Sequence, residues 1–258
     1  MTGVKLNSGD LMPPIGFGTW QILLSGKASR AVEEALKVGY RLIDTARIYG
    51  NERGVGLAIR QSDIPRKDIF VTTKLWNNSH GRQESKKAFN HSLSRLGLDY
   101  VDLYLIHWPS SGRLLETWQA LEEINKTGKA KNIGVSNYNT DHLKEAIKGS
   151  KTIPAVNQIE FHPFVYARQK PVFEYCQKHG IVIEAYSPLA HGHGIDNPTV
   201  SSLAAKYQKT NAQVMIRWCI QHGTIPIPKS SHPRRMHENI DVFDFELSKQ
   251  DMTQLNNL

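Results

Sequence analysis

The segment LIDTARIYGNE, residues 42–52, joins a buried-strand pattern to polar chemistry at its end. Leu42 and Ile43 are apolar, but Asp44 puts a carboxylate where the apolar run closes, and a phenol follows at Tyr49. The residues after Tyr49 begin a helical pattern. A single carboxylate in such a place is ordinarily a helix cap or a turn former. Its meaning therefore depends on how the other strands of the chain end.

Eight apolar runs of this kind alternate with helical patterns along the 258 residues. Several of the helical patterns close on a glycine, which is a common stop signal for a helix. The apolar runs are PIGFG (14–18), RLID (41–44), IFVTTKL (69–75), YVDLYLIH (100–107), KNIGVS (131–136), AVNQIE (155–160), IVIEAYS (181–187) and TIPIPK (224–229).

This alternation, with no linker between the units, predicts an α/β fold: a (β/α)8 TIM barrel in a single domain over residues 1–258. The segment VKLNSGDLMPP, residues 4–14, is expected to form a short β-hairpin before the first barrel strand. A doubly wound sheet uses the same alternation, but its GxGxxG fingerprint should follow the first strand. Residues 16–21 read GFGTWQ and lack the third glycine, so the barrel is favoured.

The composition limits the cellular compartments in which the protein is expected to work. The chain is 40% hydrophobic and 22% charged, which is ordinary for a globular protein, and no apolar run approaches a membrane span. The N-terminus has no apolar segment typical of a secretory signal. Cys176 and Cys219 both lie in helical patterns, which indicates free buried thiols and a cytoplasmic location. HGHG, residues 191–194, lacks a third ligand, so no metal is expected.

A net charge of +8 raises the question of an anionic partner. Lysine and arginine are scattered along the chain, and no nucleic-acid-binding module is recognisable, so nucleic acid is not expected. The one dense basic cluster is KSSHPRRMH, residues 229–237. A small phosphorylated ligand suits that cluster better than a polymer does. We expect the protein to be a monomer.

Polar residues at the strand ends locate the candidate site. In a (β/α)8 barrel the C-terminal ends of all strands converge on one mouth, where active sites lie. Seven of the eight runs deliver hydrogen-bonding groups there, which weakens the interpretation of Asp44 as a cap. The groups are Asp44, Lys74, His107, Ser136 with Asn137, Asn157 with Gln158 and Glu160, Tyr186 with Ser187, and Lys229 with Ser230.

Three of these residues, together with Tyr49, suggest addition of hydride to a carbonyl. A carboxylate at Asp44 favours the charged form of Lys74. That ammonium is expected to pull the pKa of Tyr49 below its usual value of about 10, so that the phenol can protonate a developing alkoxide. His107 can orient the carbonyl oxygen by a hydrogen bond. No side chain supplies hydride, so a nicotinamide cofactor is implied.

The chain resembles the aldo-keto reductase family from its N-terminal hairpin almost to its last residue. The resemblance implies a catalytic tetrad in which Tyr49 is the general acid, and whose other members are Asp44, Lys74 and His107. The matching stretches are GFGTW, LIDTARIYGNE, TTKLW, LIHWP, IGVSNY, NQIEFHP, AYSPLA and IPKSSHPRRMHEN.

The resemblance also implies the cofactor site. The IPKSSHPRRMHEN segment opens a helix, whose N-terminus favours an anion, and its cations favour NADPH over NADH. The residues so assigned are Ser136, Asn137 and Gln158 on the carboxamide; Tyr186 on the nicotinamide ring; Ser187 and Leu189 along the pyrophosphate; Thr19 and Trp20 at the rim; Lys229, Ser230 and Arg235 on the 2′-phosphate; and Glu238 and Asn239 on the adenine.

Three tryptophans, Trp20, Trp76 and Trp108, each stand beside a mouth residue and are expected to form an apolar substrate pocket together with His107. The connection SSGRLLE, residues 110–116, is shorter than the loop that many relatives place over this pocket. An open apolar pocket predicts broad reduction of a small carbonyl substrate, with aromatic and medium-chain aldehydes preferred over small polar sugars.

Two other functions compete with this interpretation. A Schiff-base lyase or aldolase would use Lys74 as a nucleophile, since barrels with a mouth lysine and a phosphate site suit that chemistry. It needs a neutral Lys74, and Asp44 argues against one. A catalytically silent NADPH-binding regulatory subunit would need no intact tetrad, and all four residues are present.

Overall fold

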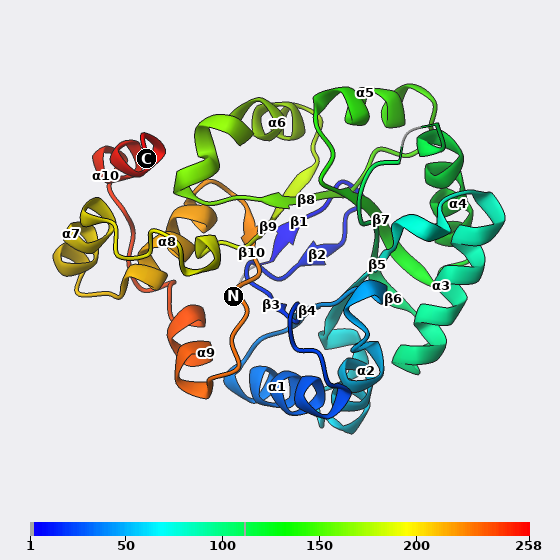
Figure 1. Cartoon of the computed structure of the whole chain (residues 1–258), viewed down its shortest axis with the longest axis horizontal. Helices are drawn as coiled ribbons and strands as arrows, with labels where there is room; N and C mark the ends of the chain where they lie inside the picture. The colour runs from blue at the N-terminus through cyan, green and yellow to red at the C-terminus, as the bar shows by residue number, and fades with distance from the viewer. Residues whose placement is uncertain (1–2, 111) are drawn as a thin grey trace.

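A computed structural model of the chain describes residues 3–110 and 112–258. Within these ranges eight parallel strands form one sheet in chain order (Figure 1), and each overlaps one of the eight predicted runs, so the barrel prediction is confirmed. The strands are β3 (Phe17–Gly18), β4 (Leu42–Asp44), β5 (Phe70–Leu75), β6 (Val101–Ile106), β7 (Ala130–Ser136), β8 (Val156–Glu160), β9 (Val182–Tyr186) and β10 (Ile225–Pro226).

The first and last strands meet at a seam that closes the barrel. Gly16 N–H donates to the Pro226 carbonyl at 2.9 Å, and Gly18 N–H donates to the Pro228 carbonyl at 3.1 Å. A Cβ atom on Gly18 would lie 2.8 Å from the carbonyl oxygen of Ile227, closer than real side chains approach. The GFG stretch is therefore explained by close strand contact at the seam, without a phosphate.

Helices surround the strands as an outer ring (Figure 1). The first of them shows why they form: Ala28, Val32, Ala35 and Leu36 recur at helical spacing and are buried against the sheet, and Gly39, at φ 115°, ends the helix in a left-handed conformation. In the described ranges the helices are α1 (Ser25–Val38), α2 (Glu52–Gln61), α3 (Arg82–Leu96), α4 (Leu114–Lys126), α5 (Thr140–Lys148), α6 (Tyr166–Lys178), α7 (Pro198–Tyr207), α8 (Asn211–Gln221), α9 (Pro233–Ile240) and α10 (Lys249–Asn256).

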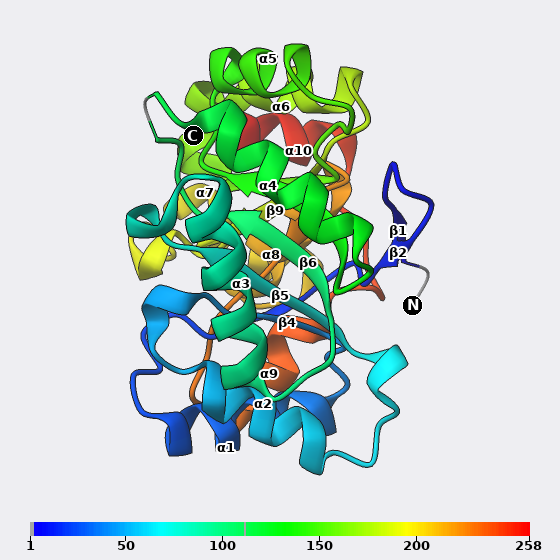
Figure 2. The same cartoon turned by 90° about the vertical axis from the view of Figure 1, so that its right-hand side faces the viewer.

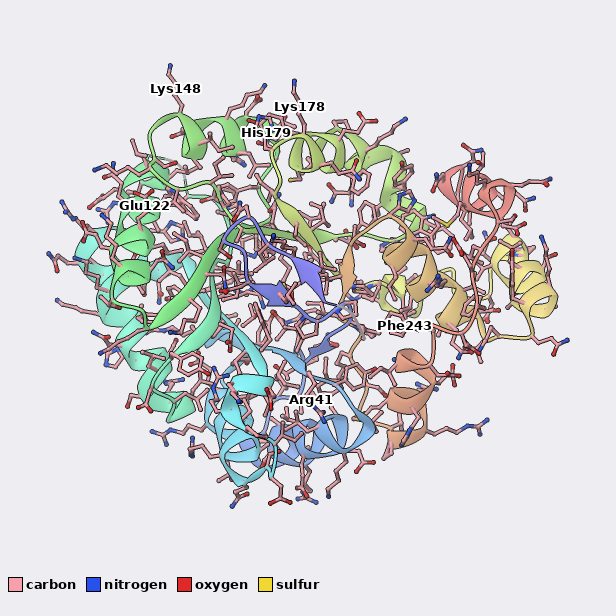
Figure 3. All side chains as sticks on the ribbon, turned by 180° about the vertical axis from the view of Figure 1, so that it is seen from behind. Arg41, Glu122, Lys148, Lys178, His179 and Phe243 are labelled. Atoms are coloured by element: carbon pink, nitrogen blue, oxygen red, sulfur yellow. The ribbon has the colours of Figure 1, made fainter. Side chains whose placement is uncertain are left out.

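The predicted hairpin is present as β1 (Val4–Lys5) and β2 (Leu11–Met12), which pair antiparallel. Asn132 Nδ2, near the start of β7, donates to Asp10 Oδ2 at 2.8 Å and so ties the hairpin to the N-terminal end of the barrel. Figure 2 shows the hairpin projecting at that end, and Figure 3, seen from behind, shows it in front of the strands. The hairpin thus covers one end of the barrel, and the C-terminal ends of the strands open at the other.

Two predictions from composition also have a structural counterpart. Cys176 and Cys219 are free and buried, and burial raises the pKa of each thiol, that of Cys176 to about 12. Thiols in that state are poor nucleophiles, so both cysteines serve packing. None of the helices in the described ranges is both long and apolar enough to cross a membrane.

Candidate active site

The structure brings the four residues of the expected tetrad together at the barrel mouth. Asp44 ends β4, Lys74 lies near the end of β5, and His107 directly follows β6. These three strands are hydrogen-bonded neighbours, so their C-terminal side chains emerge side by side. Tyr49 ends the 3-10 turn η1 (Arg47–Tyr49), which follows β4.

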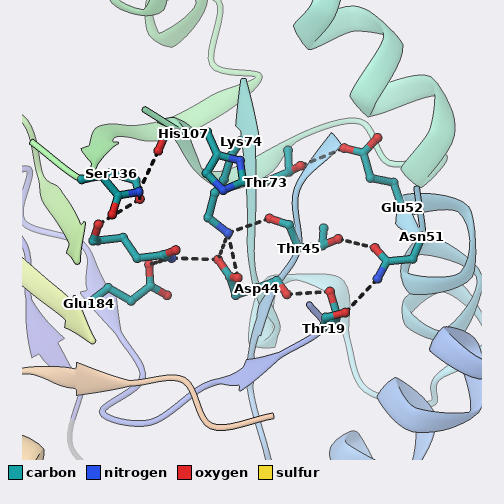
Figure 4. Close-up of polar contacts among 12 residues, drawn as sticks. Thr19, Asp44, Thr45, Asn51, Glu52, Thr73, Lys74, His107, Ser136 and Glu184 are labelled. Atoms are coloured by element: carbon teal, nitrogen blue, oxygen red, sulfur yellow. Dashed lines mark hydrogen bonds and ion pairs between the residues drawn. The ribbon is translucent and has the colours of Figure 1, made fainter. Parts of the chain in front are cut away.

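Lys74 is bound in a cage of three oxygens (Figure 4). Its Nζ lies 2.7 and 2.6 Å from the two carboxylate oxygens of Asp44 and 3.0 Å from the Thr45 carbonyl, so each ammonium hydrogen has an acceptor. Burial is the largest single influence and lowers the pKa of Lys74, but the charges of Asp44, Tyr49 and Glu184 and the hydrogen bond to Asp44 together outweigh it, so the net pKa is raised. A charged lysine with no free lone pair cannot form a Schiff base, which disfavours the lyase interpretation.

Tyr49 differs from the expectation in its pKa. The Nζ atom of Lys74 lies 5.2 Å from the centre of the Tyr49 ring, as the predicted coupling requires. Burial nevertheless raises the pKa of Tyr49 to about 12, because it outweighs the lowering by Lys74, whose charge Asp44 partly offsets. The prediction of a lowered pKa is therefore wrong. The phenol stays protonated, and it can still protonate an alkoxide, which is a far stronger base than a phenolate.

His107 packs between two aromatic rings. Its ring lies edge-on to Tyr49 at 5.8 Å and to Trp76 at 5.2 Å between centres. Burial, followed by the charge of Lys74, lowers the pKa of His107 to about 3. The imidazole is therefore neutral near pH 7 and offers one N–H donor. A neutral donor beside a phenol is suited to orienting a carbonyl oxygen without competing for the proton.

An array of amide and hydroxyl groups adjoins His107. Asn137 Nδ2 donates to the His107 carbonyl and to Ser136 Oγ, both at 3.0 Å, and the Tyr186 hydroxyl donates to Asn137 Oδ1 at 2.9 Å. These residues come from the ends of β7 and β9, which flank β8. Alternating donors and acceptors on a half-buried ledge fit a planar carboxamide such as that of nicotinamide.

Gln158, in β8, links this array to the charged pair below it. Its Nε2 donates to Asp44 Oδ2 at 2.9 Å and to Glu184 Oε2 at 2.7 Å (Figure 4). Glu184, in β9, is fully buried and was not among the sequence-predicted site residues. A signal was present: Glu184 precedes Tyr186 by two positions, so strand alternation places both on the same face.

A second group that the sequence did not reveal fixes the loop carrying Trp20. Asn51 is fully buried, and its Nδ2 donates to the carbonyls of Thr19 (2.9 Å) and Ile22 (3.1 Å), while its Oδ1 accepts from Thr45 Oγ1 at 2.7 Å. Thr19 is itself fully buried, with Oγ1 donating to the Asp44 carbonyl at 2.9 Å. Thr19 thus lies beneath the mouth and not at its exposed rim, where it was expected.

The basic segment after β10 presents free charge. The side chains of Lys229, Arg234 and Arg235 are exposed, and within the described ranges none of them forms an ion pair. The residue before α9, His232, gives no side-chain cap, so N–H groups of the first helical turn stay available to an anion. Ser230 is different, because its Oγ already bonds the backbone of His232.

The remaining residues assigned to the cofactor lie before and after this basic segment in the sequence. Ser187, at φ 48°, has its Oγ 2.9 Å from His191 Nε2, and Leu189 is partly buried just before the turn η5 (Ala190–Gly192). On α9, Glu238 Oε1 accepts from Thr210 Oγ1 at 2.8 Å, and Asn239 is buried.

The three tryptophans expected to form the substrate pocket differ in how far they are exposed. Trp76 packs on His107, whereas Trp20 and Trp108 are 46% and 42% exposed. Ile48, 48% exposed in the turn before Tyr49, is a further apolar group at the rim. In the short connection SSGRLLE, residue 111 lies outside the described residues. Among those described, no three His, Cys, Asp or Glu side chains gather as a metal site.

A sequence model of the aldo/keto reductase family matches residues 14–194 and 196–258. The chain belongs to the aldo-keto reductase family. Its activity is accordingly that of an oxidoreductase that reduces carbonyl groups to alcohols.

Individual relatives agree over nearly the full length. Glyoxal reductase of Bacillus subtilis is 47% identical over 255 residues, which cover 99% of this chain and 92% of that protein. The structure of an aldo/keto reductase from Brucella melitensis superposes with a TM-score of 0.95 at 48% identity and covers 100% of this chain and 99% of its own. A Bombyx mori aldo-keto reductase, solved in complex with NADP, gives 0.92 at 37% identity and covers 99% and 92%.

Proposed function

We propose that this protein reduces aldehydes with NADPH, with Tyr49 as the general acid. One observation carries the proposal: the Lys74–Asp44 pair, at 2.6 Å, lies beneath a protonated Tyr49 that also packs on a neutral His107. When bound, the nicotinamide supplies the hydride. His107 orients the carbonyl oxygen, and the Tyr49 hydroxyl gives its proton to that oxygen as negative charge develops there. Lys74 stabilises the phenolate that remains.

The cofactor proposal rests on two regions. Ser136, Asn137 and Gln158 would hold the carboxamide, with Tyr186 against the ring, since their hydrogen-bonding groups gather beside His107. Lys229 and Arg235, which form no ion pair with any described residue, would bind the 2′-phosphate through charge-assisted hydrogen bonds, which are the stronger kind. The remaining assigned residues would be Ser187 and Leu189 at the pyrophosphate, Trp20 near the cofactor with Thr19 buried beneath it, Ser230 at the phosphate, and Glu238 and Asn239 at the adenine. The NADP bound by the Bombyx mori relative supports this choice.

For the substrate we propose a broad range of aldehydes. Trp20, Trp76 and Trp108 would form its apolar wall, beside His107. The name of the Bacillus subtilis relative supports an aldehyde as the reacting group. We further propose that residues 1–258 act as one domain and a monomer in the cytoplasm, with no nucleic-acid partner. The two free buried thiols and the scattered cations support this proposal.

The test is NADPH oxidation with a panel of aldehydes, followed by absorbance, with Tyr49→Phe as the matched control. The expected result is aldehyde-dependent oxidation that the control lacks. NADPH binding without turnover of any aldehyde would favour the silent regulatory subunit. Substrate trapped on Lys74 by borohydride would favour the Schiff-base enzyme. Either result would overturn the proposal.

A further inference from the structure

Two carboxyl groups hold one amide inside the barrel. The Nε2 atom of Gln158 carries two hydrogens, and these are directed to Asp44 Oδ2 at 2.9 Å and Glu184 Oε2 at 2.7 Å. Flipping the amide would set its carbonyl oxygen against the carboxylate of Asp44, which disfavours the flipped orientation. In the described ranges no hydrogen bond occupies Gln158 Oε1. This oxygen is left as the free acceptor.

Glu184 differs from Asp44 because no cation among the described residues pairs with it. It is fully buried, and its Oε1 has no hydrogen-bond partner among the described residues. Both oxygens of Asp44 engage Lys74, so an ionised Glu184 would be a second buried anion facing a single, already paired cation. Burial, then the charge of Asp44, raises the pKa of Glu184 to about 8. At neutral pH the side chain is mostly a neutral acid.

The groups around Glu184 that have shifted pKa values change charge well outside the pH range in which Glu184 titrates. Asp44 of β4 and Lys74 of β5 face it, with Tyr49 within electrostatic range. Its sheet neighbours, β8 and β10, place the neutral Gln158 and Ile225 beside it. The pKa of Tyr49 is about 12 and that of Lys74 is raised. Of these three groups with shifted pKa values, only Glu184 gains or loses its proton between pH 7 and 9.

We propose that Glu184 is a positioning residue of the reductase, which with Asp44 fixes the Gln158 amide so that its carbonyl oxygen accepts from the nicotinamide carboxamide. The inference rests on the proposed function and deepens it. It assigns the acid a second effect. Once ionised, Glu184 places a negative charge below the nicotinamide site, and this charge favours the positively charged oxidised ring over the neutral reduced one.

Two variants of the full chain separate positioning from packing. Glu184→Gln keeps an acceptor oxygen for Gln158 but cannot ionise, whereas Glu184→Ala removes the acceptor. We expect the dissociation constant of NADPH to rise about two- to tenfold in the alanine variant, the effect of one lost hydrogen bond. Recovery of most of that loss by glutamine is the expected result. Equal affinities in the wild type and the alanine variant would overturn the inference.

The decisive readout is the ratio of the dissociation constants of NADPH and NADP⁺, measured by fluorescence titration from pH 6 to 10. In the wild type the ratio should rise several-fold through pH 8, as Glu184 ionises. In Glu184→Gln the ratio should not change with pH. This measurement tests the inference even if the alanine variant does not fold. A rise in the glutamine variant equal to that of the wild type would overturn the inference. A wild type that fails to bind or oxidise NADPH would instead refute the proposed function.

Discussion

The barrel mouth contains two charged regions, one buried within the barrel and one exposed to solvent. Lys74 and Asp44 are buried and paired at 2.6 Å, whereas Lys229 and Arg235 are exposed and, within the described ranges, unpaired. In the buried region the fold has already met the cost of removing charges from water, so the charges act on each other and on Tyr49. In the exposed region water solvates the cations until an anion replaces it. Chemistry should therefore fail when the first region is altered, and affinity alone when the second is.

The strongest test of the buried region is Tyr49→Phe. The variant keeps the ring against His107 and removes only the proton donor, so turnover should fall ~10²–10⁴-fold, the usual worth of general acid catalysis. NADPH affinity should stay close to that of the wild type, because Tyr49 is not expected to bind the cofactor. Steady-state kinetics and fluorescence titration measure the two quantities. Turnover within a few-fold of the wild type would exclude Tyr49 as the acid.

The second test asks whether the buried pair also holds the fold. Lys74→Met leaves Asp44 uncompensated in the barrel, and removing one partner of a buried pair costs about 3–5 kcal/mol of unfolding free energy. Chemical denaturation measures the loss. Lys74→Met combined with Asp44→Asn should recover much of the stability and none of the activity.

A matched control is the exposed pair Lys37–Glu33 on α1, whose side chains are 65% and 54% accessible. Lys37→Met should leave stability nearly unchanged, because exposed pairs are well solvated when broken. Similar losses from Lys74→Met and Lys37→Met would contradict the contrast between buried and exposed charge.

The third test concerns the exposed region. Lys229→Ala and Arg235→Ala should each weaken NADPH by roughly 1.5–3 kcal/mol, about ten- to a hundredfold, and NADH much less, because only NADPH carries the 2′-phosphate. Turnover at saturating cofactor should change little. Lys148→Ala, at the exposed end of α5 (Figure 3), removes the same charge away from the site and should affect neither cofactor. Equal losses for NADPH and NADH would refute the phosphate assignment.

The sequence predicts the buried region well where geometry follows from topology. Asp44, Lys74 and His107 end or follow three consecutive strands, and in a parallel barrel consecutive strands are neighbours, so their meeting could be predicted before any coordinates were known. The seam glycines, Gly16 and Gly18, illustrate the same point, because the missing third glycine argued against a dinucleotide fingerprint, and in the structure both glycines lie where a Cβ atom would clash across the seam.

What depends on packing could not be predicted. The lowered pKa expected for Tyr49 came from its charged neighbours alone, whereas the balance is set by how deeply the ring is buried. Glu184 lies in the middle of β9, so the pattern of polar residues at strand ends does not point to it, although it shares a face of the strand with Tyr186. The family resemblance implies that Thr19 lies at the rim with Trp20, but adjacent residues point in different directions, and the Thr19 hydroxyl is buried against Asp44.

The smallest expected effect concerns the rim, which is neither buried nor charged. Trp20, Ile48 and Trp108 are each more than two-fifths exposed, so they offer apolar contact and few hydrogen bonds. Apolar pockets discriminate weakly, by about 1–3 kcal/mol per methylene, and a sugar hydroxyl has little to bind there. The kcat/KM for a nitrobenzaldehyde should therefore exceed the kcat/KM for an open-chain sugar. Trp20→Ala should lower the kcat/KM for the nitrobenzaldehyde, and so this ratio, more than it lowers turnover of a small dialdehyde. A clear preference for the sugar would mean that polar side chains, and not the tryptophans, define the pocket. In that case the rim would resemble the exposed region of Lys229 and Arg235, because it would recognise its ligand through hydrogen bonds.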